Sequence, residues 1–382
     1  MPAGAAELTG DTKIDPDTTN DWTQYTRPDG SPSTQNVGRI WTDKSVFNEG
    51  YTFTSDDAGG LNGQTVGQGN SDFLVGLSAL SSTSNLKEMV QTGKPLDIVL
   101  VLDDSGSMAY SFGEPLSSSE LDTSKTYVIE QNYGILGTSY QEIYYDQDRG
   151  QWGYYTGLIF QRWESVNPNQ TDVYQIRKNA LQDAVNDFID QTAEMNGTVS
   201  NENNKIQIGT VVFSSNASVE DRLTVCEDTG VDSLKQTIND LQANGGTNPG
   251  AAMESASDAF LQSREGAKKV VIFFTDGEPD PESNGYPAVT NAYNLKHGQN
   301  ATIYTIGIFD GANPAADPAQ NGTSMANVLM HAMSSNYPNA TEWSRNQLGQ
   351  RTPESDYYKT AADAGELDEV FQDIFDESTE DV

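Results

Sequence analysis

"LDIVLVLDDSGSM", residues 96–108, passes abruptly from a largely apolar run to a short polar cluster. An apolar run of this length is typical of a strand that is covered on both faces, as in a parallel sheet. The cluster that follows, Asp103 to Ser107, cannot extend the core because its polar groups would lose their contact with water. We therefore expect these side chains at the end of the strand, where the backbone turns and a functional site can form.

Apolar strands and amphipathic helices alternate along the rest of the chain. Residues 173–193 and 366–375 carry apolar side chains at helical spacing. Alternation of this kind predicts an α/β fold with a doubly wound, mostly parallel sheet flanked by helices. Further strands are expected at 205–215, 268–275 and 301–310, and a short edge strand at 356–361.

The composition is strongly acidic. Among 382 residues, 56 are Asp or Glu and 21 are Lys or Arg, so the formal net charge is −35. Such a chain repels phosphates, which excludes a general nucleic-acid or anionic-membrane surface. The single cysteine, Cys226, excludes an internal disulfide and a cysteine-based zinc site, and the two histidines argue against a Ser-His-Asp triad. No run approaches the ~20 apolar residues of a membrane-spanning helix.

Two more polar segments follow the same logic as the first. Asp276 comes directly after the apolar strand at 268–275, and Thr247 lies in a glycine-rich loop just before a helix. In open α/β sheets, sites lie beyond the carboxyl ends of the strands, so these residues should meet the first cluster at one edge. Carboxylate and hydroxyl oxygens are hard ligands that match Mg²⁺, Mn²⁺ or Ca²⁺. The expected metal ligands are Asp103, Ser105, Ser107, Thr247 and Asp276.

These motifs resemble the metal-ion-dependent adhesion site of von Willebrand factor A domains. DDSGSM at 103–108 fits the Asp-x-Ser-x-Ser pattern, and GGTN at 245–248 and FTDGEP at 274–279 look like its second and third parts, in the family's order. The resemblance covers about residues 95–376. It implies a Rossmann-like fold in which both serines and the threonine coordinate the metal directly or nearly so. The aspartates would bind the metal directly or through water.

A second resemblance concerns the segments upstream of the first motif. GRIWTDKSV at 38–46 and DFLVGLSALSS at 72–82 look similar to segments of von Willebrand A-containing surface proteins and pilus-tip adhesins of Gram-positive bacteria. This resemblance implies an extracellular protein at the cell surface, anchored to the cell wall through a missing C-terminal region. It also implies contacts with other pilus or surface subunits through missing parts of the chain.

The chain is expected to divide into an extended lead-in at 1–35, an N-terminal β-strand segment at 36–92 and the A domain at 93–378. Residues 109–172 form an aromatic-rich arm, inserted where a plain A domain has a short loop, and 142–155 is typical of a β-hairpin. Its aromatic side chains either form the core of a small β excursion or present a ligand surface beside the metal. The expected ligand contacts are Tyr144, Tyr145, Trp152, Tyr154 and Tyr155.

Three classes of function fit these observations to different degrees. The favoured one is a metal-dependent adhesion module that binds a host or matrix protein or glycan through a divalent cation. The alternative is a structural or assembly component of a pilus or surface layer with a structural metal. An enzyme is not expected: Asp104 and Glu278 are the spare acids near the site, and the chain has no GxxxxGK phosphate-binding loop. No catalytic residue, nucleic-acid partner or membrane insertion is predicted.

Overall fold

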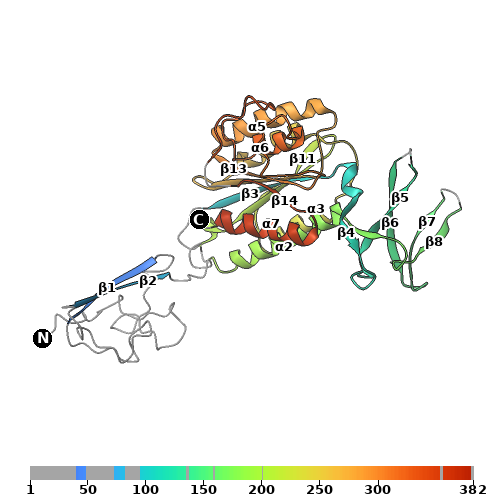
Figure 1. Ribbon diagram of the computed structural model, residues 1–382, viewed down its shortest axis with the longest axis horizontal. Coiled ribbons are helices and arrows are strands. Elements are labelled where there is room, and N and C mark those ends of the chain that lie inside the picture. The colour runs from blue at the N-terminus through green and yellow to red at the C-terminus, as the bar shows by residue number, and fades with distance from the viewer. Residues whose placement is uncertain are drawn as a thin grey trace. The chain divides into compact units, whose positions relative to one another are not determined.

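Two compact units make up the chain, Met1–Thr92 and Gly93–Val382. In the first unit, β1 (Ile40–Asn48) and β2 (Phe73–Ser81) pair as antiparallel strands (Figure 1). The lead-in expected at 1–35 lies outside the described residues. The computed structural model describes these two strands and residues 95–134, 137–157, 160–199, 201–352 and 356–379.

A six-stranded sheet forms the centre of the second unit, in the order β11-β10-β3-β12-β13-β14. Neighbouring strands are parallel, except that β11 runs antiparallel to β10. This arrangement is the mostly parallel sheet that the alternating pattern predicts, and β14 is the expected edge strand. The strands are β3 (Leu96–Asp103), β10 (Gln207–Phe213), β11 (Ala217–Val225), β12 (Lys268–Thr275), β13 (Ala301–Gly307) and β14 (Tyr358–Thr360).

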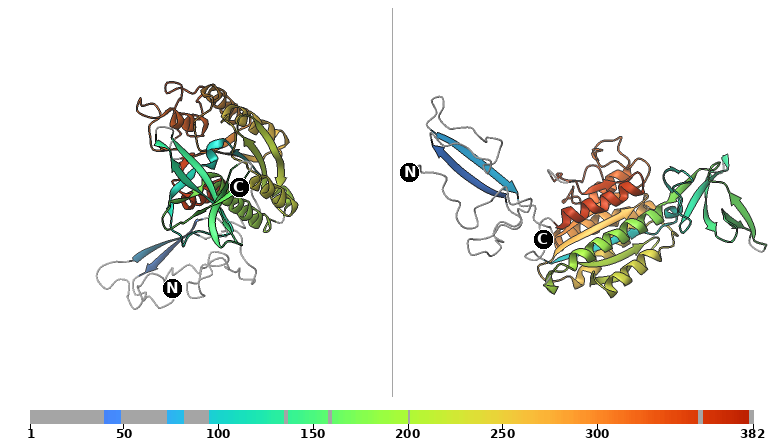
Figure 2. Two further views of the ribbon diagram at one scale, coloured as in Figure 1. Left: turned by 90° about the vertical axis from the view of Figure 1, so that its right-hand side faces the viewer. Right: turned by 90° about the horizontal axis from the view of Figure 1, so that it is seen from below.

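Helices cover both faces of this sheet, which confirms the predicted fold class. Figures 1 and 2 show α2 and α7 on one face, and α5 and α6 on the other. Within the described ranges, none of the helices combines the length and the apolar character that crossing a membrane requires. The α-helices are α2 (Arg177–Asn196), α3 (Thr229–Asn239), α4 (Pro249–Ala259), α5 (Gly285–Gly298), α6 (Met325–Met333) and α7 (Ala364–Thr379), and the short 3₁₀ helices are η4 (Gly106–Ala109), η6 (Glu202–Asn204), η7 (Phe260–Gln262) and η8 (Glu282–Asn284).

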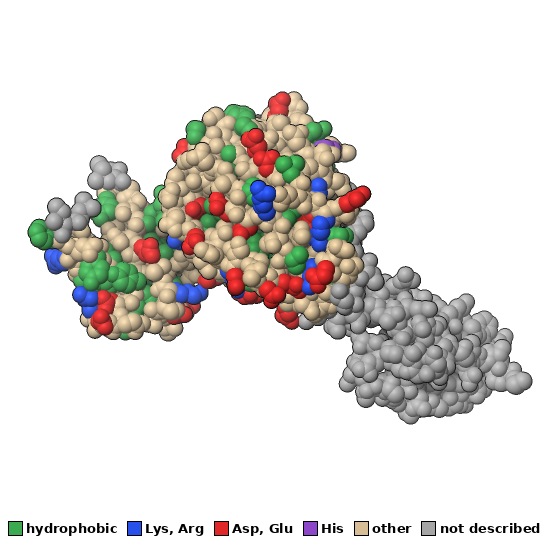
Figure 3. Space-filling model, turned by 180° about the vertical axis from the view of Figure 1, so that it is seen from behind, with side chains coloured by type: hydrophobic (Ala, Val, Ile, Leu, Met, Phe, Trp, Pro, Cys, Tyr) green, Lys and Arg blue, Asp and Glu red, His purple; other side chains and the backbone are tan. Residues whose placement is uncertain are grey.

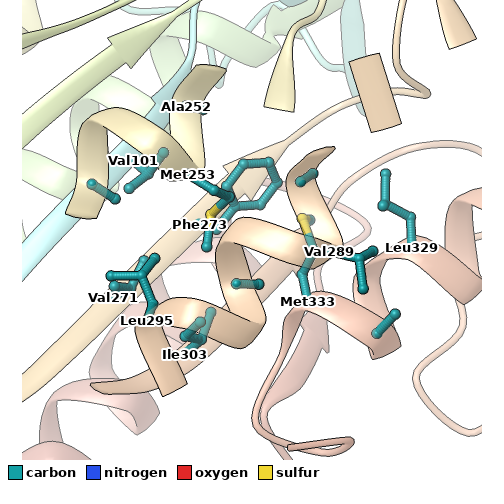
Figure 4. Packing of buried hydrophobic residues seen from close by; sticks show 14 of the residues in the cluster. Val101, Ala252, Met253, Val271, Phe273, Val289, Leu295, Ile303, Leu329 and Met333 are labelled. Atoms are coloured by element: carbon teal, nitrogen blue, oxygen red, sulfur yellow. The ribbon is translucent and has the colours of Figure 1, made fainter. Parts of the chain in front are cut away.

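Alternating residues of the central strands build the core beneath α4, α5 and α6. Val101 of β3 and Phe273 of β12 are fully buried, and they share one cluster with Met253, Val289 and Met333 from the helices (Figure 4). Burial of an apolar side chain of this size contributes roughly 1.5–3 kcal/mol relative to exposure. The strands are therefore held firmly up to the edge where the polar motifs begin.

A second six-stranded sheet, here called the arm, follows β3 and η4 and is antiparallel throughout, in the order β4-β9-β5-β6-β7-β8. The hairpin expected over 142–155 is present as β6 and β7, which pair with Tyr145 opposite Trp152. The strands are β4 (Ser111–Leu116), β5 (Thr126–Asn132), β6 (Thr138–Asp146), β7 (Gln151–Thr156), β8 (Arg162–Val166) and β9 (Val173–Ile176).

The arm ends later than the sequence predicts. A helix was expected from Val173, but Val173–Ile176 form β9, and α2 begins at Arg177. Val173 and Ile176 fit the helical spacing, yet Val173 is fully buried in the small core of the arm. Tertiary packing overrides the local pattern at this point.

Candidate metal centre

The first and third sequence motifs meet at one edge of the central sheet. β3 and β12 are adjacent parallel strands in which Leu102 lies opposite Phe274. Asp103 at the end of β3 and Asp276 just after β12 therefore reach the same edge. The site expected at the carboxyl ends of the strands is thus formed by residues far apart in the chain.

Hydrogen bonds join four of the five expected ligands, Asp103, Ser105, Ser107 and Asp276, into one largely buried cluster. The Ser107 hydroxyl donates to Asp276 Oδ1 at 2.7 Å, and the hydroxyl oxygens of Ser105 and Ser107 are 3.2 Å apart. Asp103 accepts from the Thr275 hydroxyl at 2.6 Å and from the Ser105 backbone N–H at 2.8 Å. The exposed fractions of Asp103, Ser105 and Asp276 are 0%, 1% and 2%.

The loop that carries Thr247 is attached to the first motif. The Gly106 N–H donates to the Gly245 carbonyl at 3.1 Å, and a Cβ on Gly106 would lie 3.4 Å from that oxygen. Thr247 is buried and exchanges two backbone hydrogen bonds with Asp280, of 3.2 and 2.9 Å. The structure therefore places the Thr247 segment beside the Asp-x-Ser-x-Ser turn, as the motif order predicts.

Asp104 has a positioning role that the sequence did not reveal. Its carboxylate accepts hydrogen bonds from the backbone N–H groups of Gln242 and Ala243, at 3.1 and 2.6 Å. Its own N–H donates to Phe213 at 2.7 Å, and its carbonyl accepts from Asn244 at 2.8 Å. Asp104 therefore connects the end of β3 to β10 and to the loop that leads to Thr247.

Two carboxylates, those of Asp103 and Asp276, lie close together at this buried edge. A positive charge nearby would therefore stabilise their ionised forms. Burial, and secondly the neighbouring Asp276 carboxylate, raise the pKa of Asp103 to about 7. Arg177 at the start of α2 supplies one positive charge, with its Nη1 2.9 Å from Asp276 Oδ2. Sequence reasoning missed Arg177, because a single arginine at the start of an amphipathic helix has no motif around it.

The donor set fits a hard divalent cation. Among the residues that the structure describes, no group of three or more His, Cys, Asp or Glu side chains is placed to hold a metal. A cation at this edge would depend on two carboxylates together with hydroxyl oxygens. Such donors suit Mg²⁺, Mn²⁺ or Ca²⁺ and do not suit zinc, which prefers nitrogen and sulfur. The residues that would hold it are Asp103, Ser105, Ser107, Thr247 and Asp276.

The five expected ligand-contact residues of the arm divide between its two faces. Tyr145, Trp152 and Tyr154 belong to the arm's own core, and Trp152 is only 8% exposed. Tyr144 and Tyr155 lie on the opposite face, where both make edge contacts with Trp163, at 5.5 and 5.2 Å between ring centroids.

Of the two tyrosines beside Trp163, Tyr155 is exposed to solvent and Tyr144 is half-buried. Tyr155 is 41% exposed, and the Arg149 guanidinium lies 5.1 Å from the Trp163 ring centroid. Figure 3 shows hydrophobic side chains gathered on the arm, next to basic ones. The sequence could not separate the two groups, since which face is covered depends on the pairing of β6, β7 and β8.

Comparison with known proteins identifies the domain. The family model of the von Willebrand factor type A domain matches residues 173–347. This match begins where the arm returns to the central domain, so β3 and the first motif lie upstream of it. No curated protein matches the chain.

Several solved structures are similar to the chain at low identity. Proximal thread matrix protein 1 from the mussel byssus is 17% identical with a TM-score of 0.38, over 74% of this chain and 48% of that one. The pilus adhesin SpaC from Lactobacillus rhamnosus GG is 15% identical with a TM-score of 0.42, over 76% and 31%. The PilB minor pilin from Streptococcus sanguinis is 14% identical with a TM-score of 0.44, over 92% and 81%. The chain spans less than half of the length of the first two, at 48% and 31%. On the family match and the α/β architecture together, this chain contains a von Willebrand factor type A domain.

Proposed function

We propose that this protein is a metal-dependent adhesion module that binds a host or matrix protein or glycan. The observation that carries the proposal is the buried cluster in which Ser107 and Asp276 are hydrogen bonded at 2.7 Å beside the fully buried Asp103. Burial of paired carboxylates is costly unless a cation compensates them. A divalent cation that binds Asp103 and Asp276 would provide that compensation.

The mixture of ligands suggests how such a site would recognise a partner. Ser105, Ser107 and Thr247 offer neutral oxygens, so a bound Mg²⁺, Mn²⁺ or Ca²⁺ would keep much of its positive charge. The ion, when bound, supplies an open coordination position for an acidic group of the partner. The hydroxyl and carboxylate side chains fix where this group is received, at the edge of the sheet beside the arm.

The arm is the element we propose for specificity, because one coordination position accepts any carboxylate. Its base follows η4 directly, so a partner held at the metal edge would lie near it. We propose Tyr155, which is exposed, and the half-buried Tyr144 as the aromatic contacts with a partner, and both rings rest against Trp163. Tyrosine and tryptophan bury large areas at low entropic cost, which suits a contact surface.

An extracellular, cell-surface location, with attachment to the cell wall, belongs to the same proposal. Its support is the resemblance of the upstream segments to bacterial surface proteins and the strongly acidic composition, with a formal net charge of −35. Other pilus or surface subunits would be partners of the whole protein. The proposal includes no catalytic role, and a screen for phosphatase and esterase activity tests that part.

Binding to immobilised matrix proteins and glycans, with Mg²⁺ or with EDTA, tests the adhesion proposal. We expect at least one ligand to be retained in Mg²⁺ and released by EDTA, and Asp276→Asn to lose that ligand in Mg²⁺. Asp258→Asn, at an exposed position in the last turn of α4 and outside the arm, is the matched control and should bind like the wild type. Binding that is equal in Mg²⁺ and EDTA would contradict a metal-dependent mechanism.

One observation favours the alternative of a structural or assembly component. Tyr145, Trp152 and Tyr154 are used to build the core of the arm, which gives these aromatics a structural purpose. Under this alternative the cation would stabilise the domain without mediating adhesion. A protein that melts at a higher temperature in Mg²⁺ but retains no ligand from the panel would support it.

A further inference from the structure

Arg177 contacts both the metal edge and the base of the arm. Its Nη1 is 2.9 Å from Asp276 Oδ2, and its Nε donates to the Ser111 carbonyl at 3.2 Å. The guanidinium carbon lies 5.7 Å from the centre of the Tyr110 ring. The Arg177 side chain is 19% exposed and that of Asp276 is 0% exposed, so this ion pair is largely shielded from water.

The contacts continue from Arg177 into the arm. The Arg177 N–H donates to the Tyr110 carbonyl at 3.1 Å, which closes the two ends of the arm on each other. The Tyr110 ring stacks on Tyr140 of β6, with centroids 4.1 Å apart and an interplanar angle of 14°. An unbroken series of contacts therefore leads from β6 through Tyr110 and Arg177 to Asp276.

The guanidinium of Arg177 and a bound divalent cation would repel each other, because both are positively charged. Both oxygens of the Asp276 carboxylate have partners in this structure, Oδ1 with Ser107 and Oδ2 with Arg177. A cation held by Asp103 and Asp276 would lie close to the guanidinium, and burial leaves the repulsion between these positive charges weakly screened. The guanidinium and the cation therefore compete for the negative charge of Asp276.

We propose that Arg177 sets the cation affinity of this edge and couples cation binding to the base of the arm. The inference rests on the proposed metal-dependent function and extends it. Without a cation, Arg177 neutralises Asp276 and holds Ser111 and Tyr110. With a cation bound, the guanidinium gives up Asp276 Oδ2, and the contacts that the same group makes with the arm are loosened.

Titration calorimetry with Mn²⁺ alone tests the affinity part. Arg177→Gln should bind Mn²⁺ about tenfold more tightly than the wild type, the size of a typical coupling between sites. In EDTA the same variant should melt at a lower temperature, since Asp276 loses its ion pair with Arg177. A merely structural role would predict weaker stability and equal or weaker Mn²⁺ binding. Arg162→Gln, which removes an arm arginine whose side chain is 80% exposed, is the matched control and should match the wild type.

Hydrogen exchange of the arm base tests the coupling part. Mn²⁺ should speed exchange in Ser111–Leu116 and Val173–Ile176 of the wild type and change little in Arg177→Gln. Arg177→Lys keeps the charge but lacks the fork that spans Asp276 and Ser111. Its Mn²⁺ affinity should lie within about twofold of that of the wild type, because the positive charge sets the affinity. It should lose the exchange response to Mn²⁺, because that response depends on the forked hydrogen bonding of arginine.

The outcomes separate this inference from the proposed function. Mn²⁺ binding by the wild type together with equal or weaker binding by Arg177→Gln would overturn the role of Arg177 in affinity. If Mn²⁺ leaves the hydrogen exchange rate at the base of the arm unchanged in the wild type, the coupling between cation binding and the arm is overturned. Absence of Mn²⁺, Mg²⁺ and Ca²⁺ binding by the wild type would overturn the metal-dependent function itself.

Discussion

The Ser107 hydroxyl donates a 2.7 Å hydrogen bond to Asp276 Oδ1, although 169 positions separate the two residues. The strands that precede them, β3 and β12, are parallel neighbours, so both motifs lie at the same edge. The loop before α4 completes the arrangement, since two of its backbone N–H groups donate hydrogen bonds to the Asp104 carboxylate. The geometry of the site thus depends on the pairing of buried strands, and the experiments below separate the ligands from their supports.

Asp104→Ala should destabilise the domain by about 2 kcal/mol, because the backbone N–H groups of Gln242 and Ala243 lose a charged acceptor. Urea unfolding monitored by circular dichroism measures this change. Asp148→Ala, at an exposed position, should leave the free energy of unfolding within about 0.5 kcal/mol. Equal stability of Asp104→Ala and Asp148→Ala would show that Asp104 does not hold the loop.

Removal of the arm should leave the central domain folded. Tyr110 and Arg177 are joined by a 3.1 Å backbone hydrogen bond, so a short Gly-Ser linker can replace residues 111–176 between them. The shortened protein should unfold cooperatively and still bind a divalent cation, while binding of the matrix ligand weakens. Unfolding of the shortened protein would make the arm a structural part of the domain, and undiminished ligand binding would remove it from recognition.

Gly153→Ala should disrupt the arm and spare the rest. A Cβ at Gly153 would lie 2.3 Å from the Glu164 carbonyl oxygen and 2.5 Å from the Trp163 ring, closer than packing allows. The near-ultraviolet circular dichroism spectrum should lose the aromatic signal of the arm. The helical signal in the far-ultraviolet should stay unchanged. A Cβ at Gly298 would have no other atom within 4 Å, so Gly298→Ala serves as the control. A spectrum for Gly153→Ala like that of the wild type would contradict the packing of Trp163 over this strand.

Acid should destabilise the domain through His331. Its side chain is buried, and burial, with a smaller effect of Arg351, lowers its pKa to about 4 from the usual 6.5 of a histidine. Between these two pKa values the unfolded chain binds a proton that the folded protein does not, so the free energy of unfolding falls as the pH falls. The loss reaches about 3 kcal/mol near pH 4.

Urea unfolding of the wild type and of His331→Gln at pH 7 and pH 4.5 measures the contribution of His331. The wild type should lose more stability between the two pH values than the variant does. Parallel pH dependences in the two proteins would show that His331 does not resist protonation in the folded state.

Much of this structure follows from the sequence because the informative patterns are long and buried. The apolar runs around Val101 and Phe273 predict central strands, and the polar residues that follow each run predict the edge where they meet. The pattern at Val173 was misleading, since four residues with helical spacing complete the sheet of the arm as β9.

Other features depend on contacts between distant residues and leave no local signal. Arg177 reaches Asp276 through the start of α2, and Asp104 supports a loop more than a hundred positions away, with 138 positions between it and Gln242. Trp152 and Tyr155 are three positions apart and both aromatic, yet Trp152 is buried in the arm's core and Tyr155 is exposed. Strand alternation places these two side chains on opposite faces, but it does not say which of the two faces is covered.

The central claim is that Asp103, Ser105, Ser107, Thr247 and Asp276 hold one divalent cation. Calorimetric titration of the wild type and of Asp103→Ala with Mg²⁺ and Mn²⁺ tests it most directly, with circular dichroism to confirm that the variant is folded. We predict one binding site in the wild type and no measurable binding by Asp103→Ala. Binding of either ion by folded Asp103→Ala with the affinity of the wild type would contradict the account.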